Sequence, residues 1–301
     1  MQQRFTPATT LALAITLVCW ASAFAGIRAG LEAYSPGHLA LLRFLVASAA
    51  LVPLAAYFRL PLPRLADVPH ILLHGFLGYF GYHVCLNIGE QTVSAGSACF
   101  IIGFIPVFSV LLAALLLAEP LTRRVLAGIG VSVCGIGLIA WAEGGGAAFD
   151  TGALWVLAAA LSESLFFVLQ KPKLDVYRAV HYTIYAMWGG TLPMLLFLPG
   201  LGEAVAAAPA PATWAVVYLG IFPSAIAYAT WTFAISRLPV GKVIVTQYAM
   251  PLMTVAIAWV WLGELPAPMA FAGGLLALLG VFVGTRPPKR PPRRAESAHS
   301  P

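Results

Sequence analysis

The chain has 301 residues, of which 60% are hydrophobic and only 9% are charged, and its formal net charge is +6. An ordinary soluble domain carries about 25% charged residues. A soluble globular fold is therefore excluded, because it could not bury so much apolar surface, and the composition indicates an integral membrane protein.

Ten apolar segments follow one another along the chain, each long enough for a helix that needs about 20 residues to cross the hydrocarbon core. They cover residues 9–28, 37–58, 69–88, 93–118, 122–141, 152–171, 180–199, 212–235, 240–262 and 267–285. The connections are short and leave no room for a separate soluble domain. The sequence thus predicts an all-α integral membrane fold with ten transmembrane helices.

The basic residues support this number of helices, since cytoplasmic loops of membrane proteins are enriched in Lys and Arg. If the N-terminus is cytoplasmic, fifteen of the seventeen Lys and Arg residues fall on the cytoplasmic side. The two others are Arg28, in an outer loop, and Arg43, within the second segment. Both termini are therefore expected in the cytoplasm. The positive net charge is explained by this topology, so nucleic-acid binding is not expected.

One pattern occurs twice, as PVFSVLLAALLLAE from Pro106 to Glu119 and as PLMTVAIAWVWLGE from Pro251 to Glu264. The copies lie about 145 residues apart. They divide the chain into two related five-helix repeats, 8–142 and 149–285. Because five is an odd number, the second repeat enters the membrane from the opposite side, and the repeats are inverted. Such repeats usually enclose a site near the bilayer midplane that is exposed to each side in turn.

The last stretch, residues 286–301, is rich in Pro and Arg and is expected to be a disordered basic cytoplasmic tail. The cysteines are scattered singly among the apolar segments and suggest neither disulfides nor a zinc site.

The doubled pattern and three further motifs resemble EamA-type members of the drug/metabolite transporter superfamily over nearly the whole chain. The motifs are Trp20-Ala21-Ser22-Ala23-Phe24, Arg43-Phe44 and Leu262-Gly263-Glu264. The resemblance implies a ten-helix transporter of a bacterial-type inner (plasma) membrane that exports amino acids or other small metabolites. One position departs from the family pattern: the counterpart of Trp20 in the second repeat is Glu163, where an aromatic residue is common.

Two stripes of polar and aromatic residues suggest a binding site. Tyr79, Tyr82 and His83 share one face of the third segment, and Ser224, Tyr228 and Trp231 share one face of the eighth. These segments are repeat partners, so their stripes are expected to face each other. Aromatic walls with a few polar groups suit a partly apolar ligand. Ordinary helix packing is the alternative explanation of both stripes.

Further candidates lie in other segments. Trp20 is about 16 Å into its helix, too deep for an interfacial tryptophan, and Gln247 stands one turn before Pro251. Glu163 is placed in mid-membrane, where an acidic residue is costly. It is interpreted as a proton carrier or as the counter-charge of a substrate amine. A structural carboxyl bonded to Ser22, Ser162 or a backbone is the alternative.

Other polar residues admit structural readings. Arg43 could extend outward to the interface, or it could hold a substrate carboxylate or the carbonyls of another helix. Glu264 is expected to cap or pair loops. Glycines at 26 and 30, and at 128, 130, 135 and 137, are expected at close helix contacts. Asp67, His70 and His74 share a face at the start of the third segment, but their place near the interface argues against a metal site.

The chain is therefore expected to be a secondary transporter that exports small metabolites by alternating access, with aromatic or apolar amino acids as the leading substrate class. The alternatives are another substrate class (nucleoside, vitamin or organic acid), a lipid-head-group flippase component or a membrane enzyme. Substrate and bilayer are the expected partners, and proton coupling stays open. No enzyme activity, cofactor or metal is expected, and the sequence does not give the oligomeric state.

Overall fold

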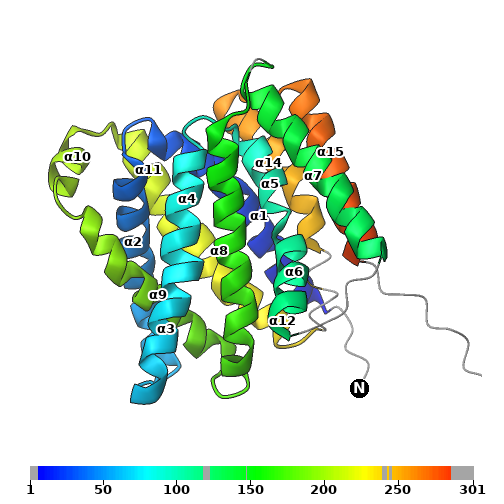
Figure 1. Ribbon diagram of the computed structural model, residues 1–301. Coiled ribbons are helices and arrows are strands. Elements are labelled where there is room, and N and C mark those ends of the chain that lie inside the picture. The colour runs from blue at the N-terminus through cyan, green and yellow to red at the C-terminus, as the bar shows by residue number, and fades with distance from the viewer. Residues whose placement is uncertain (1–5, 118–122, 147, 239–242, 244–245, 286–301) are drawn as a thin grey trace, which may run out of the picture.

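The computed structural model describes residues 6–117, 123–146, 148–238, 243 and 246–285, so the predicted basic tail and Glu119 lie outside the described residues. All regular structure in this part of the chain is helical (Figure 1). The α-helices are α1 (Pro7–Leu31), α2 (Pro36–Tyr57), α3 (Val68–Gly75), α4 (Tyr82–Gly89), α5 (Ala95–Ile102), α6 (Ile105–Leu117), α7 (Arg123–Glu143), α8 (Thr151–Leu174), α9 (Ala179–Met194), α10 (Leu201–Ala207), α11 (Ala210–Leu219), α12 (Ala227–Ile235), α14 (Met250–Leu262) and α15 (Pro268–Thr285). Short turns of other helix types are η1 (Leu65–Asp67), η2 (Phe76–Gly81), η3 (Leu195–Phe197), η4 (Gly220–Ile226) and η5 (Gln247–Ala249).

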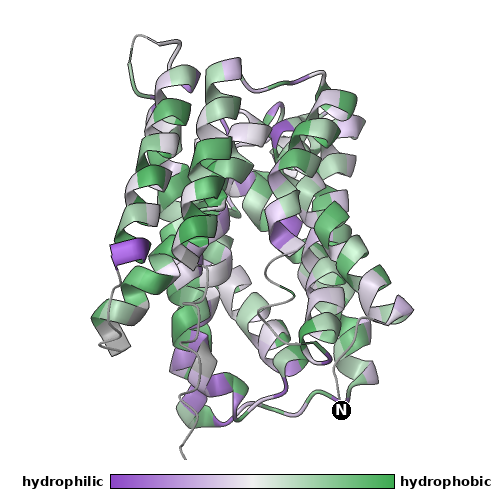
Figure 2. Ribbon diagram, turned by 90° about the vertical axis from the view of Figure 1, so that its right-hand side faces the viewer, coloured by the Kyte–Doolittle hydropathy of each residue, from purple (hydrophilic) through white to green (hydrophobic). Residues whose placement is uncertain are grey.

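Seven helices among the described residues are long and apolar enough to cross a membrane, and an eighth arises if the bent pair Ala179–Phe197 and Leu201–Ala207 is one span. Gln247–Leu262 and Pro268–Gly284 are shorter apolar helices. Most of the helical ribbon consists of hydrophobic residues, and several hydrophilic segments lie near the end of the bundle where the N-terminus lies (Figure 2). The fold is thus a multi-pass helical bundle. Each of the ten expected segments overlaps a helix, while the number of crossings stays a prediction.

The two ends of the bundle are named here by one residue each. Helix α1 runs from the N-terminus to the end where its Arg28 pairs with Glu264, at the top of Figure 1. Helix α2 returns to the end where Asp67 lies, at the bottom of that view. We call them the Glu264 end and the Asp67 end.

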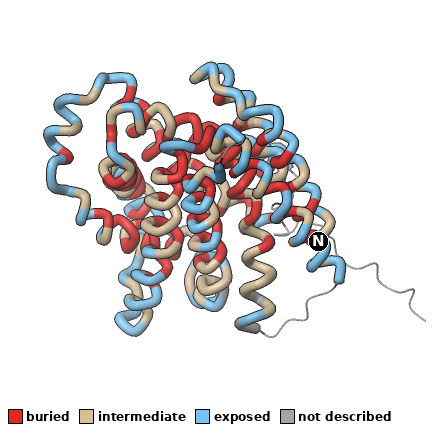
Figure 3. Tube along the Cα trace, turned by 45° about the horizontal axis from the view of Figure 1, so that its top comes forward, coloured by how far each residue is buried: buried red, intermediate tan, exposed pale blue. Residues whose placement is uncertain are grey.

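Helices α1 and α8 have similar neighbourhoods. Helix α1 packs against α11, α12 and α14, and α8 packs against α4, α5 and α6. In the same way α2 contacts η4, while α9 contacts α3 and η2. Helices α7 and α15 form a closely packed pair at one side (Figure 1). Buried residues lie mostly toward the middle of the bundle, and the outward sides of the helices are exposed (Figure 3).

The α7–α15 pair is held together by small residues. A Cβ atom added to Gly135 would lie 2.5 Å from the backbone of Gly273 and Ala277, so only glycine permits this approach. The Ser132 hydroxyl donates to the carbonyl of Ala277 at 2.9 Å. Glycines 26, 30 and 128 also lie at close contacts, as expected. The expectation is wrong for glycines 130 and 137, where no described atom lies within 4 Å of an added Cβ.

Several expected segments are interrupted rather than continuous. The third expected segment contains the π-helical turn η2, and the eighth contains the π-helical turn η4, about 145 residues later. Pro223 explains the second turn in part, because it lacks the N–H that an α-helix needs. The fourth segment is divided into α5 and α6, just before Pro106. The seventh bends by 83° toward α10 at Gly200, whose φ of +78° favours glycine. Sequence periodicity alone does not report such local breaks.

Candidate functional site

A cavity of about 190 Å³ lies within the bundle, between the helices of both halves of the chain. All eight residues that the sequence analysis selected line it: Trp20, Tyr79, Tyr82, His83, Glu163, Tyr228, Trp231 and Gln247. The cavity extends from Ile27 and Leu86, toward the Glu264 end, to Leu174 and Ala179, at the Asp67 end. Pro106 and Pro251 also line it, so both prolines of the doubled sequence pattern adjoin the cavity.

One wall of the cavity is an aromatic group from α1 and α12. The Trp20 ring lies 5.4 Å from that of Tyr228 and 5.1 Å from that of Trp231, measured between centroids. The Trp20 Nε1–H donates to the carbonyl of Pro223 at 3.1 Å. That carbonyl belongs to η4, so the irregular turn helps to fix the orientation of the indole. The wall is therefore rigid and largely apolar, with the Tyr228 hydroxyl as a polar group.

A second aromatic group comes from η2 and α4. The His83 ring lies 4.6 Å from those of both Phe44 and Tyr82, and the Tyr79 ring contacts that of Tyr228 with 5.6 Å between the centroids. The two predicted stripes therefore meet, as expected from the repeat. Neither ring nitrogen of His83 has a hydrogen-bond partner among the described residues, and the same holds for the Tyr79 hydroxyl. Buried polar atoms in proteins are rarely left in this condition, so these groups are available to a ligand or water.

Arg43 is the basic group of the cavity. Its side chain is 2% exposed, and its Nε donates to the Ser224 hydroxyl on η4 at 2.9 Å. The reading that Arg43 extends outward to the interface is wrong, because the guanidinium is turned into the protein and lines the cavity. Its Nη1 is buried and has no partner in the described part of the chain. A buried guanidinium with free donors is suited to a carboxylate or phosphate.

Glu163 is the acidic group of the cavity and projects from α8. The residue is 5% exposed, and its Oε2 is buried without a hydrogen-bond partner among the described residues. The structural alternative named two serines, but Ser22 bonds to Tyr218 and Ser162 to the carbonyl of Leu77. The Oε2 atom of Glu163 therefore has no hydrogen-bond partner in the described structure, and it can interact with a cation or carry a proton.

Tyr82 and Tyr228 line the cavity together with the two charged groups. Each is within electrostatic range of both Arg43 and Glu163. No ion pair joins Arg43 to Glu163 in the described part of the chain. The cavity thus has a basic pole, Arg43, and an acidic pole, Glu163, which are not joined in an ion pair.

The family comparison agrees with this arrangement of two halves. The EamA-like transporter family model matches the chain twice, over residues 8–141 and 150–286. The chain belongs to the EamA-like transporter family. The protein is therefore a multi-pass membrane transporter and not an enzyme, as the sequence predicted.

Relatives of this EamA-like protein cover nearly its full length. A "Probable terminal-alkyne amino-acid exporter" of Streptantibioticus cattleyicolor is 43% identical over 91% of this chain and 92% of its own. The "Uncharacterized transporter YdfC" of Bacillus subtilis is 42% identical over 87% of this chain and 86% of its own. A "Probable amino-acid metabolite efflux pump" of Salmonella typhimurium is 26% identical, covering 89% and 92%. A solved crystal structure with 23% identity matches the fold with a TM-score of 0.61, covering 93% of this chain and 97% of that one.

Some cavity residues of this EamA-like transporter were not selected from sequence. Phe166, Phe167, Gln170 and Leu174 line the cavity with Glu163. They follow Glu163 at helical spacings of three, four, seven and eleven residues, so the stripe is readable in the sequence once Glu163 is placed in the site. Thr183 and Tyr248 also line the cavity and lie in no comparable pattern.

The cluster at the Asp67 end has a different arrangement from a metal site. The Asp67 carboxylate accepts hydrogen bonds from Lys173 Nζ and the Tyr177 hydroxyl, each at 2.6 Å. His74 Nδ1 forms a short hydrogen bond with the Tyr182 hydroxyl. These bonds join η1 and α3 to α8 and α9. Among the described residues no group of His, Cys, Asp and Glu is placed to hold a metal ion.

Proposed function

We propose that this transporter exports amino acids with aromatic or apolar side chains by alternating access through the central cavity. The observation that carries the proposal is that Arg43 and Glu163 both line one aromatic cavity, each with a buried atom that has no hydrogen-bond partner among the described residues. An amino acid at neutral pH is a zwitterion. Its carboxylate suits the guanidinium of Arg43, and its ammonium suits the carboxylate of Glu163.

The aromatic walls match the remaining part of such a substrate. Contacts with Trp20, Tyr79 and Tyr228 favour an apolar or aromatic side chain, at about 0.5–1.5 kcal/mol per ring pair beyond the burial of area. Two relatives whose printed names mention amino acids, one of them 43% identical, agree with this class. Glu163 has a second role open to it, because a carboxyl that releases a proton as it binds the substrate ammonium would couple export to proton uptake.

We further propose ten transmembrane helices in two inverted repeats, 8–142 and 149–285, in a bacterial-type inner membrane with both termini cytoplasmic. The charge distribution supports this topology. The packing supports the repeat, since α1 with α12 and α14 corresponds to α8 with α4 and α5. The π-helical turns η2 and η4 occupy corresponding places as well. In this topology the Glu264 end faces outward and the Asp67 end faces the cytoplasm.

The conformation then corresponds to an inward-facing state. The cavity continues to Leu174 and Ala179 at the Asp67 end, where Leu174 is 38% exposed. Toward the Glu264 end it is closed by buried apolar side chains from α1, α4 and α5. Export requires the reverse arrangement, in which this closure opens and the cytoplasmic ends of α8 and α9 approach their neighbours.

Competition for one binding site tests the proposed substrate class. Purified transporter would be assayed with tryptophan, its decarboxylated analogue tryptamine, its deaminated analogue indole propionate, and a nucleoside, each competing against a labelled aromatic amino acid. Tryptophan should compete best, because only it carries both charges and the ring. Equal competition by either single-charge analogue, or stronger competition by the nucleoside, would contradict the zwitterion site. Saturable binding of a lipid head group in place of tryptophan would favour the flippase alternative.

A further inference from the structure

Two separate hollows approach each other at the Glu264 end of α1. Phe24 and Ile27 line the central cavity, whereas Arg28 and Leu31 line a second hollow that opens at the Glu264 end. Ile27 and Arg28 are consecutive, so less than one helical turn separates the linings of the two hollows. In the proposed topology the second hollow is an outer vestibule, and the material between them is the outer gate. We call this material the septum.

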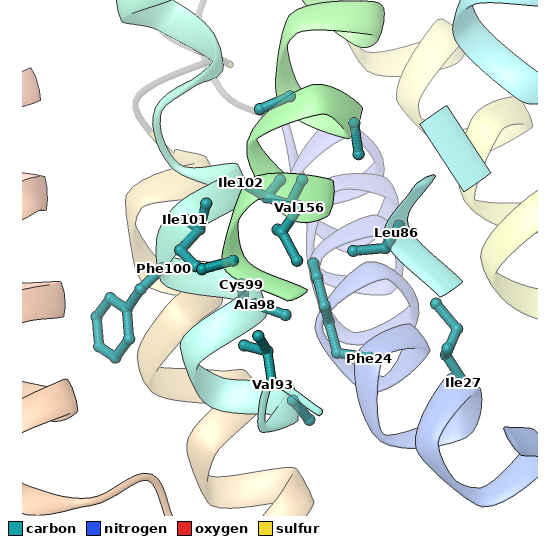
Figure 4. Packing of buried hydrophobic residues seen from close by; sticks show 14 of the residues in the cluster. Phe24, Ile27, Leu86, Val93, Ala98, Cys99, Phe100, Ile101, Ile102 and Val156 are labelled. Atoms are coloured by element: carbon teal, nitrogen blue, oxygen red, sulfur yellow. The ribbon is translucent and has the colours of Figure 1, made fainter. Parts of the chain in front are cut away.

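The cavity side of the septum is apolar. Figure 4 shows Phe24 and Ile27 of α1 beside Leu86 of α4, with Ala98 and Cys99 of α5 nearby. All five side chains are buried, with exposures of 0–3%. Close packing of this kind excludes water, so the septum blocks passage from the cavity to the vestibule.

The vestibule side of the septum is held by charged groups. Arg28 Nε forms an ion pair with Glu264 Oε2 at 3.2 Å, and the other oxygen of Glu264 accepts from the backbone N–H of Ala95 at 2.7 Å. Arg28 Nη1 donates to the backbone carbonyl of Glu90 at 2.6 Å. These bonds connect the end of α1 to the end of α4, the start of α5 and the end of α14. Separating α1 from α4 or α14, or α5 from α14, would break one of these bonds.

The side chain of Glu90 is buried within this network but takes no part in its hydrogen bonds. Glu90 directly follows the membrane-length helix Leu65–Gly89 and has an exposure of 0%. Neither of its carboxyl oxygens has a hydrogen-bond partner among the described residues. An ionised carboxylate in such a place would carry a large desolvation cost, whereas a protonated one carries a much smaller cost.

The charged and titratable groups that act on Glu90 come from several elements of the bundle. Arg28 of α1, Arg43 of α2 and Glu264 after α14 act on it electrostatically, and it acts in turn on Cys99 of α5. The two nearby acids of α7 and α8 are engaged elsewhere: Glu143 with Ser94 and Ser97, and Asp150 with Thr92. Burial raises the pKa of the Glu90 carboxyl well above its usual range, and Arg28 opposes this only in part.

We propose that Glu90 is a proton-binding site of the outer gate, neutral while the septum is closed and ionised when the septum opens to the vestibule. The proposal rests on the alternating-access function proposed above. When α1 and α4 separate, water reaches the carboxyl and Arg28 becomes its natural counter-ion. The proton is taken from and returned to the outer solution, so this site regulates the gate separately from any proton carried by Glu163.

The direction of the pH effect follows from which state binds the proton. The closed septum holds one more proton than the open one, so a lower outside pH favours closure and a higher outside pH favours opening. For a single proton the limit is tenfold in the closed-to-open ratio per pH unit, reached between the pKa values of the two states. The effect belongs to the outer solution, because the closed septum separates Glu90 from the cytoplasm.

Thiol labelling from outside measures the opening. An Ile27→Cys variant lacking the four native cysteines would be placed in right-side-out vesicles and exposed to a membrane-impermeant methanethiosulfonate at outside pH 6 and pH 8, without substrate. A Leu31→Cys variant, with its cysteine in the vestibule, is the matched control for the reactivity of the reagent. The rate at position 27 divided by that at position 31 should rise several-fold from pH 6 to pH 8.

The same ratio in a Glu90→Gln background should be low at both pH values, because the amide is neutral in both states. In a Glu264→Gln background the pH dependence should persist. If Glu90→Gln does not fold, Glu90→Asp must shift the midpoint of the pH dependence. Any one of three results would overturn the proposal. They are a labelling ratio that does not change with pH when Glu90 is intact, an unchanged pH dependence in Glu90→Gln, and an unmoved midpoint in Glu90→Asp. Because no substrate is present, a failure here is distinct from a failure of the amino-acid assignment.

Discussion

Replacement of Arg43 by Gln tests the basic pole of the cavity. The guanidinium is buried, its Nη1 has no partner in the described structure, and its Nε is already bonded to Ser224. A hydrogen bond to a charged group contributes about 1.5–3 kcal/mol, which corresponds to roughly a 10- to 150-fold change in Kd. Arg43→Gln should therefore weaken the binding of an amino acid by that factor. It should leave the corresponding amine, which has no carboxylate, nearly unaffected.

The measurement is equilibrium binding of tryptophan and tryptamine to purified wild-type and variant protein. Arg43→Lys is the matched control, because it keeps the charge but loses the planar fork and the geometry of the Ser224 bond. The affinity of Arg43→Lys for tryptophan should lie between those of the wild-type protein and Arg43→Gln. If Arg43→Gln weakened both ligands by the same factor while the protein stayed monodisperse, Arg43 would act only in helix packing, and the reasoning would be refuted.

Three other predictions concern packing, the acidic pole and topology. Gly135→Ala should lower the thermal unfolding temperature in detergent, since overpacking costs about 1–3 kcal/mol. Gly137→Ala should leave this temperature nearly unchanged, because a Cβ at that position meets no described atom within 4 Å. Equal effects of the two substitutions would contradict the contact at Gly135. Glu163→Gln should abolish pH-driven transport if Glu163 carries the proton, or weaken amine binding at every pH if Glu163 is the counter-charge of the substrate. Unchanged binding, transport rate and pH profile in this variant would make Glu163 a structural residue only. Cysteines at Gly146 and Gly202 should react with an impermeant reagent from outside and one at Pro288 only after permeabilisation; labelling of all three from one side would exclude the ten-helix topology.

The multi-pass helical bundle could be predicted from the sequence because apolar segments of membrane length have few alternative structures. The interruptions of these helices could not be predicted from the sequence. The π-helical turns η2 and η4 and the break between α5 and α6 depend on which backbone groups find partners in the assembled bundle. The glycines illustrate the same limit, since Gly135 touches α15 and Gly137, two residues later, faces away from its neighbours.

The candidate site was accessible from the sequence for a different reason. Repeat symmetry places Tyr79 and Tyr228 opposite each other, and mid-membrane depth identifies Trp20 and Glu163. Arg43 has both an interfacial and an inward position open to it, and only the bond to Ser224, 181 residues away, decides between them. Glu90 was missed because it lies at the end of an apolar segment, where acidic residues usually face water. Its burial arises from the packing of neighbouring helices in the assembled bundle, which no local pattern reveals.

The most direct test of the central claim is a crystal or cryo-EM structure of the protein with a bound aromatic amino acid. The ligand carboxylate should lie within hydrogen-bonding distance of Arg43, the ammonium near Glu163, and the ring between Trp20 and Tyr79. A ligand bound in the cavity with neither charged group at these residues, or bound outside the cavity, would contradict the proposed recognition of a zwitterion.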